Sequence, residues 1–239
     1  MSSVGFSTGC LHRTSLTLKQ KIEFLHLIGA NAIELCFASL SELTNNAPSP
    51  AALEILKKFD SISIHAPWNI RYGKNPETDK ALKKIKALCN LLPIAAIVIH
   101  PHKIDDFTRL ESLNLPFLLE NLDNRGKTFG TRPEHFEKLK RDCDFNFILD
   151  VQHAYTHDQA MSLTKELIDV MGDRLKELHI SGCNSLLRHA PVHLAENKEA
   201  ILKILNLKIP VTKIIEGVFW ENVKGVAIKE LALIKSYEN

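Results

Sequence analysis

The chain has 239 residues, of which 45% are hydrophobic and 24% are charged, and its formal net charge is +2. This length is close to the roughly 250 residues of one eight-stranded β/α barrel, and the apolar content is sufficient for a complete core. The charge shows no basic stripe of the kind that marks a dedicated nucleic-acid binder, and no apolar run reaches the roughly 18 residues of a membrane span.

Eight short apolar runs alternate with longer amphipathic stretches. The runs are rich in β-branched or aromatic residues and are bounded by turn formers or charges, which predicts buried strands. They cover residues 4–9, 32–36, 61–65, 95–100, 116–120, 145–150, 175–180 and 211–216. The stretches between them predict helices, such as residues 15–30, where Gly29 is expected to end the helix, and residues 156–171. This alternation predicts parallel strands with crossover helices, and eight repeats favour a single (β/α)₈ TIM-barrel domain over residues 1–239.

Six consecutive predicted strands, the third to the eighth, finish at or near a histidine, aspartate or glutamate. The chain contains 28 acidic residues and 11 histidines, so six such matches in a row have a chance probability on the order of 10⁻⁵. The catalytic face of a barrel lies at the carboxyl ends of its strands, so these side chains are expected to converge there. The six residues are His65, His100, Glu120, Asp150, His179 and Glu216.

Imidazoles and carboxylates around one cavity suit a divalent cation such as Zn²⁺ or Mn²⁺. Without a cation, the buried carboxylates would repel one another, and a bound metal removes that conflict. His153, three residues after Asp150, and His189, in the loop after the seventh predicted strand, are further candidate ligands. The sequence therefore predicts a metal site in the barrel mouth.

The chain resembles the xylose-isomerase-like TIM barrels, a superfamily that includes sugar isomerases, sugar epimerases and endonuclease IV. In the epimerase branch, four strand ends in the order Glu, Asp, His, Glu hold one metal, and Glu120, Asp150, His179 and Glu216 match that order. The resemblance implies that Glu120 and Glu216 also act as catalytic acid and base. It also implies that Arg188 contacts the substrate.

The endonuclease branch adds ligands, and most of its motifs have counterparts here. They are HAPW at 65–68, IHP at 99–101, LEN at 119–121, DVQH at 150–153 and RHAPV at 188–192. The departure is Leu187, which stands where that branch has an aspartate ligand, two residues before His189. The resemblance therefore implies one or two ions and puts a third in doubt.

Three hypotheses for the function follow. The first is a sugar or sugar-acid isomerase or epimerase, with a carbohydrate substrate bound by Trp68, His102, Arg188 and His193. The second is a metal-dependent phosphodiesterase acting on abasic DNA, supported by the extra histidines and by basic residues in the predicted loops of the catalytic face. These basic residues are Arg71, Lys74, Lys103, Arg125 and Lys127. The third is a barrel that binds a metal or ligand without catalysis.

The five cysteines form no CxxC pair, and the N-terminus has no basic start followed by an apolar core. These features predict a reduced, cytoplasmic protein without a signal peptide and without a membrane partner.

Overall fold

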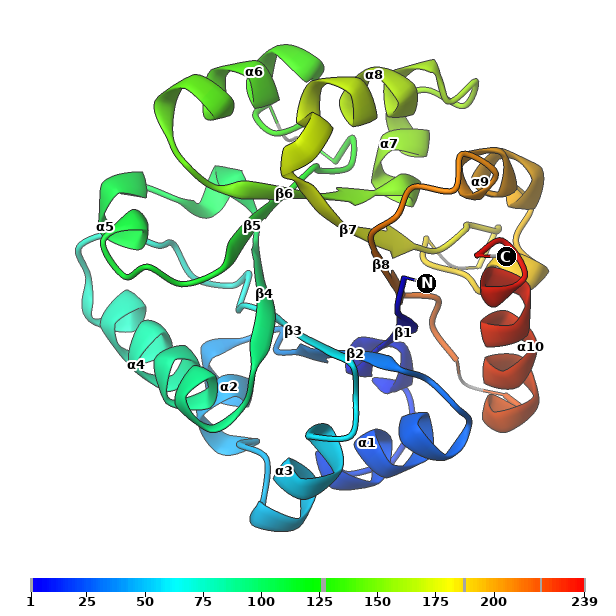
Figure 1. Ribbon diagram of the computed structural model, residues 1–239, viewed down its shortest axis with the longest axis horizontal. Helices are drawn as coiled ribbons and strands as arrows, with labels where there is room; N and C mark the ends of the chain where they lie inside the picture. The colour runs from blue at the N-terminus through cyan, green and yellow to red at the C-terminus, as the bar shows by residue number, and fades with distance from the viewer. Residues whose placement is uncertain (1, 126–127, 187, 220, 239) are drawn as a thin grey trace.

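The computed structural model describes residues 2–125, 128–186, 188–219 and 221–238. Eight parallel strands close into a barrel in chain order, with β8 paired to β1 (Figure 1). The strands are β1 (Val4–Ser7), β2 (Ala32–Cys36), β3 (Ser61–His65), β4 (Ile94–Ile99), β5 (Phe117–Glu120), β6 (Asn146–Asp150), β7 (Leu175–Ile180) and β8 (Thr212–Ile215). The predicted TIM-barrel fold is therefore confirmed.

Helices surround the strands as an outer ring (Figure 1). They are α1 (Leu18–Leu27), α2 (Leu40–Asn45), α3 (Pro50–Leu56), α4 (Pro76–Leu91), α5 (Phe107–Glu111), α6 (Pro133–Asp142), α7 (Val151–His157), α8 (Ser162–Met171), α9 (Lys198–Leu205) and α10 (Val223–Lys235). Short 3₁₀ turns form η1 (Thr8–Leu11), η2 (Pro101–Lys103), η3 (Gly172–Arg174) and η4 (Val192–Leu194). Gly29 adopts φ +88°, the left-handed conformation that the sequence predicts after α1.

Alternate residues of each strand face the barrel interior, and the others pack against the helices. On β4, Ile97 and Ile99 belong to the large core beneath the helices, whereas Val98 belongs to a small separate cluster with Ala96, Leu118 and Ile148. That apolar cluster fills the β4–β6 side of the interior. On β2 and β7 the buried positions include Glu34, Glu177 and His179. The interior is therefore apolar on one side and polar on the other.

Two local elements differ from the sequence expectation. Strand β1 ends at Ser7, because the Ser7 side chain accepts from the backbone N–H of Gly9 and starts η1. Two helices replace the single helix that is expected from residue 156. The first, α7, begins immediately after β6, where the Asp150 side chain caps it. The second, α8, begins after Met161, whose φ of +67° is incompatible with a continuous helix.

No helix in the described ranges is long and apolar enough to cross a membrane. All five cysteines lie in the described part of the chain, and all are free thiols.

Candidate metal centre

Four of the predicted ligands meet where β5 to β8 end. Glu120 is the last residue of β5, Asp150 ends β6, His179 lies on β7, and Glu216 follows β8. One ligand atom from each lies within 4.8 Å of the others. The Asn121 side chain, immediately after β5, links the ends of β5 and β6. Its Oδ1 accepts from the Asp150 backbone N–H at 2.6 Å, and its Nδ2 donates to the Asp150 carbonyl at 2.9 Å.

His65, at the end of β3, and His100, immediately after β4, form a second group with Glu120. Glu120 Oε2 lies 2.9 Å from His100 Nε2 and 3.3 Å from His65 Nε2. Its other oxygen, Oε1, lies 3.3 Å from Nδ1 of His179. One oxygen of Glu120 therefore faces His65 and His100, and the other faces His179 in the group formed at the ends of β5 to β8.

Asp150, His153 and His189 form a third group. Asp150 Oδ1 accepts from the backbone N–H of His153 at 2.8 Å, and His153 Nδ1 lies 2.9 Å from the Asn121 carbonyl. His189 Nδ1 lies 2.9 Å from the Ser181 hydroxyl. Leu187, the departure noted in the sequence, lies outside the described residues.

The electrostatics of these groups fit a cation. Burial raises the pKa of Glu216 and of Asp150, and burial lowers the pKa of His189 to about 4. Burial would also lower the pKa of His65, but its hydrogen bond with Glu120 and the charge of Glu34 raise it to about 9. Asp150 Oδ2 is buried and has no hydrogen-bond partner among the described residues. Imidazole and carboxylate donors with such an orphaned oxygen suit a divalent ion, which would stabilise the ionised carboxylates and the neutral imidazoles together.

Glu34 is a candidate site residue that the pattern of strand ends does not predict. It lies on β2 and is fully buried, and its Oε2 is 3.1 Å from His179 Nε2. Burial would raise its pKa, but the charge and hydrogen bond of His179 outweigh burial and lower it. Glu34, Glu177 and His179 form the fourth group with ligand atoms within 4.8 Å. The sequence does contain one indication of this role, a carboxylate inside an otherwise apolar strand. Such a buried charge needs a hydrogen-bond or charge partner.

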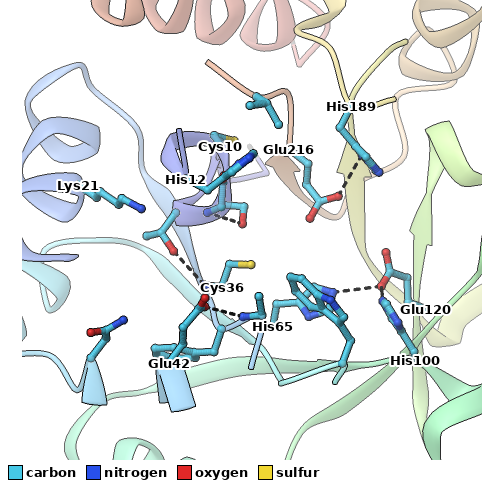
Figure 2. Close-up of a pocket in the computed structure, with 18 of the residues that line it drawn as sticks. Cys10, His12, Lys21, Cys36, Glu42, His65, His100, Glu120, His189 and Glu216 are labelled. Carbon is cyan, nitrogen blue, oxygen red and sulfur yellow. Dashed lines mark hydrogen bonds and ion pairs between the residues drawn. The ribbon is translucent and has the colours of Figure 1, made fainter. Parts of the chain in front are cut away.

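A pocket of about 1060 Å³ opens above these side chains. Figure 2 shows His100, Glu120, His189 and Glu216 on one side of it, and Lys21 and Glu42 on the opposite side. Two of the predicted substrate contacts, Trp68 and His102, line the pocket. The Trp68 ring packs edge-on against His65 at 5.1 Å and lies parallel to His100 at 6.3 Å, and the His102 ring stacks on His100 at 5.7 Å.

The two other predicted substrate contacts lie elsewhere. Arg188 is exposed and is not among the described residues that line the pocket. His193, in η4, directs Nδ1 to Oε2 of Glu230 on α10 at 2.6 Å. Glu230 is fully buried and also accepts from the backbone N–H groups of Val192, at 2.5 Å, and of His193, at 3.1 Å. His193 therefore has a structural partner away from the pocket, a contact between distant segments that spacing in the sequence does not reveal.

We expect Glu230→Ala to lower the free energy of unfolding by about 2–4 kcal/mol, because it leaves one buried and one part-buried backbone N–H group without their acceptor. Urea denaturation measures the change. Glu199→Ala, at an exposed position of α9, is the control and should change stability by less than about 0.5 kcal/mol. Equal stability of the two variants would show that Glu230 does not anchor η4.

Most basic residues that the sequence suggested as phosphate contacts are already paired. Arg71 Nε donates to both Asp105 oxygens at 3.0 Å, Lys74 lies 3.9 Å from Asp106, and Arg125 forms an ion pair with Asp123. Lys103 lines the pocket, and Lys127 lies outside the described residues. The positive charge of these loops is therefore largely neutralised.

Comparison with solved structures identifies proteins of similar fold. The chain matches endonuclease IV from Thermus thermophilus with a TM-score of 0.70 and 19% identity, over 98% of each chain. It matches a D-tagatose 3-epimerase-like protein with a TM-score of 0.70 and 17% identity, over 98% of this chain and 96% of the other. For D-psicose 3-epimerase from Clostridium cellulolyticum, the TM-score is 0.67 and the identity 14%, over 99% of each chain.

The chain therefore shares the TIM-barrel fold of these proteins, the fold that the sequence predicts. No family model and no curated protein sequence matches it. Its buried clusters of histidine and carboxylate are consistent with a divalent metal site.

Proposed function

We propose that the protein is a hydrolase of phosphate esters that works with a centre of two divalent ions. The observation that carries this proposal is the position of Glu120 between two ligand groups. Its Oε2 faces His65 and His100, and its Oε1 faces His179. A single ion held by Glu120, Asp150, His179 and Glu216 would leave His65, at the end of β3, and His100, immediately after β4, without an ion to bind.

When bound, paired ions activate a water molecule and neutralise the charge on a phosphate. His65 and His100 would hold one ion and Asp150, His179 and Glu216 the other, with Glu120 shared. Glu216 is the most exposed of these carboxylates, at 16%, whereas Glu120 and Asp150 are almost completely buried. Glu216 is therefore placed to accept the proton of the attacking water as the bond between phosphorus and the leaving oxygen breaks.

The proposed substrate is compact. A protein that follows a nucleic-acid backbone needs free cations for several phosphates, and Arg71, Lys74 and Arg125 are each paired with an aspartate. The pocket, at about 1060 Å³, is slightly larger than the range of roughly 300–1,000 Å³ for small-molecule sites. A small phosphodiester fits these features better than a long duplex does.

The second candidate is isomerisation or epimerisation of a sugar. Glu120 Oε1 and Glu216 Oε1 lie 3.3 and 3.4 Å from the same His179 nitrogen, so two carboxylates stand side by side at the pocket floor. Such a pair could remove and return a proton at the carbon next to a carbonyl. The flat face of Trp68 would contact the sugar ring.

A single set of assays separates these candidates. Protein loaded with Zn²⁺ or Mn²⁺ should cleave bis(p-nitrophenyl) phosphate and should lose that activity after chelation. A DNA duplex with an abasic site, in the same buffer, tests whether DNA is a substrate, and we expect it to be cut poorly. Proton exchange into a panel of ketoses in heavy water, without ester cleavage, would contradict the hydrolase proposal and support the second candidate.

A further inference from the structure

The buried carboxylate of Glu34 lies directly beneath the proposed metal centre. Its Cα is in register with Ser7 on β1 and with Ser63 on β3, two buried polar residues, and it is fully buried itself. The described structure leaves Glu34 Oε1 without a hydrogen-bond partner, so Oε2 makes the contact that compensates for burial of the group. That contact is with His179 Nε2, at 3.1 Å.

The two ring nitrogens of His179 face opposite groups. Nδ1 lies 3.3 Å from Glu120 Oε1 and 3.4 Å from Glu216 Oε1, on the side of the proposed metal ligands. Nε2 lies on the side of Glu34. A neutral imidazole carries one N–H, and only the other nitrogen has a lone pair available for a metal.

The position of that proton decides whether His179 can be a ligand. With the proton on Nδ1, His179 would donate to Glu120 and could not bind an ion on that side. With the proton on Nε2, it donates to Glu34, and Nδ1 is available. An ionised carboxylate only accepts hydrogen bonds, so Glu34 favours the second form.

We propose that Glu34 is a positioning residue that holds His179 in the metal-binding tautomer and orientation and thereby sets the affinity of the centre. This inference rests on the metal centre proposed above. Glu34 acts through His179 and lies on its far side from the proposed ion. Partners of this kind typically change metal affinity by about 10–100-fold when they are removed.

Glu177 provides a matched control. It is 2% exposed, and its Oε1 lies 3.6 Å from the same His179 nitrogen, beyond hydrogen-bond distance. Glu34→Gln and Glu177→Gln therefore each remove one buried carboxylate near His179 without changing its size. Only the first replaces the carboxylate that His179 contacts with an amide, whose NH₂ group can face Nε2 and which therefore no longer fixes the His179 proton on that nitrogen.

The experiment measures the Zn²⁺ dissociation constant of each protein by competition with a chelator, together with its unfolding midpoint. Glu34→Gln should raise the dissociation constant about 10–100-fold, and Glu177→Gln should raise it less than about threefold. An unchanged constant in Glu34→Gln would overturn the inference. An equal loss in both variants would also overturn it, because the effect would then come from buried charge and not from orientation.

A measurement on the unmodified protein covers the case in which Glu34→Gln does not fold. In the zinc-loaded wild-type protein, ¹⁵N NMR of labelled histidine should show His179 bound through Nδ1 and protonated at Nε2. Zinc bound through Nε2 would contradict the positioning role. A wild-type protein that binds no Zn²⁺ would refute the metal centre itself, an outcome distinct from either variant result.

Discussion

Glu120→Gln is expected to reduce the turnover of the metal-loaded protein on the order of 10³-fold or more, because one carboxylate serves both ligand groups. Its two oxygens face His65 and His100 on one side and His179 on the other. A glutamine amide has one oxygen and one NH₂ group, and the NH₂ group cannot bind a cation. Steady-state assays on bis(p-nitrophenyl) phosphate, with circular dichroism to check the fold, measure the effect.

Glu137→Gln is the matched control, since Glu137 is exposed on α6. It should retain wild-type turnover. Turnover at the wild-type level in Glu120→Gln would remove Glu120 from the chemistry of the site.

His100→Ala is expected to lower the number of bound ions by one per chain while leaving the ion at Asp150, His179 and Glu216 in place. His100 Nε2 makes the shortest contact to Glu120 in the centre, at 2.9 Å. Its side chain belongs only to the group of His65, His100 and Glu120. With one of three ligands gone, that group would no longer hold its ion firmly. Elemental analysis after dialysis measures the count, and turnover should fall by about 10²-fold or more.

His26→Ala is the control for the count, because His26 lies on α1 and packs against Phe59 with ring centroids 5.6 Å apart. It should keep the wild-type number of ions. Full retention of both ions in His100→Ala would show that His100 is not a ligand.

Much of the fold could be predicted because the strands are short, apolar and regularly spaced. In a barrel, the carboxyl ends of parallel strands meet at one face. Residues as far apart in the sequence as His65 and Glu216 were therefore expected to converge without any knowledge of the loops. The clusters of His, Asp and Glu that could hold a metal ion contain all six of the strand-end residues.

Glu34 could not be predicted in the same way. Strands of a parallel barrel are buried on both faces, so the sequence of β2 shows no alternation that separates the interior from the helix side. Glu34 is the third of the five residues of β2, whereas the six predicted ligands all lie at or near the ends of their strands.

The partners of the loop residues were also beyond prediction. His193 meets Glu230 across 37 residues, and Arg71 meets Asp105 across 34. Neither pairing has a local sequence signal, because each depends on how a loop folds back over the barrel. These pairings alter the functional interpretation, since they hold His193 away from the pocket and neutralise part of the basic surface.

The number of ions in the barrel mouth tests the central claim most directly. Crystals grown with Zn²⁺ or Mn²⁺ and measured at the absorption edge of the metal would locate each ion in an anomalous difference map. We predict two peaks that share Glu120 as a ligand, one also bound by His65 and His100 and the other by Asp150, His179 and Glu216. A single peak bound only by Glu120, Asp150, His179 and Glu216, with His65 and His100 unliganded, would contradict the two-ion account.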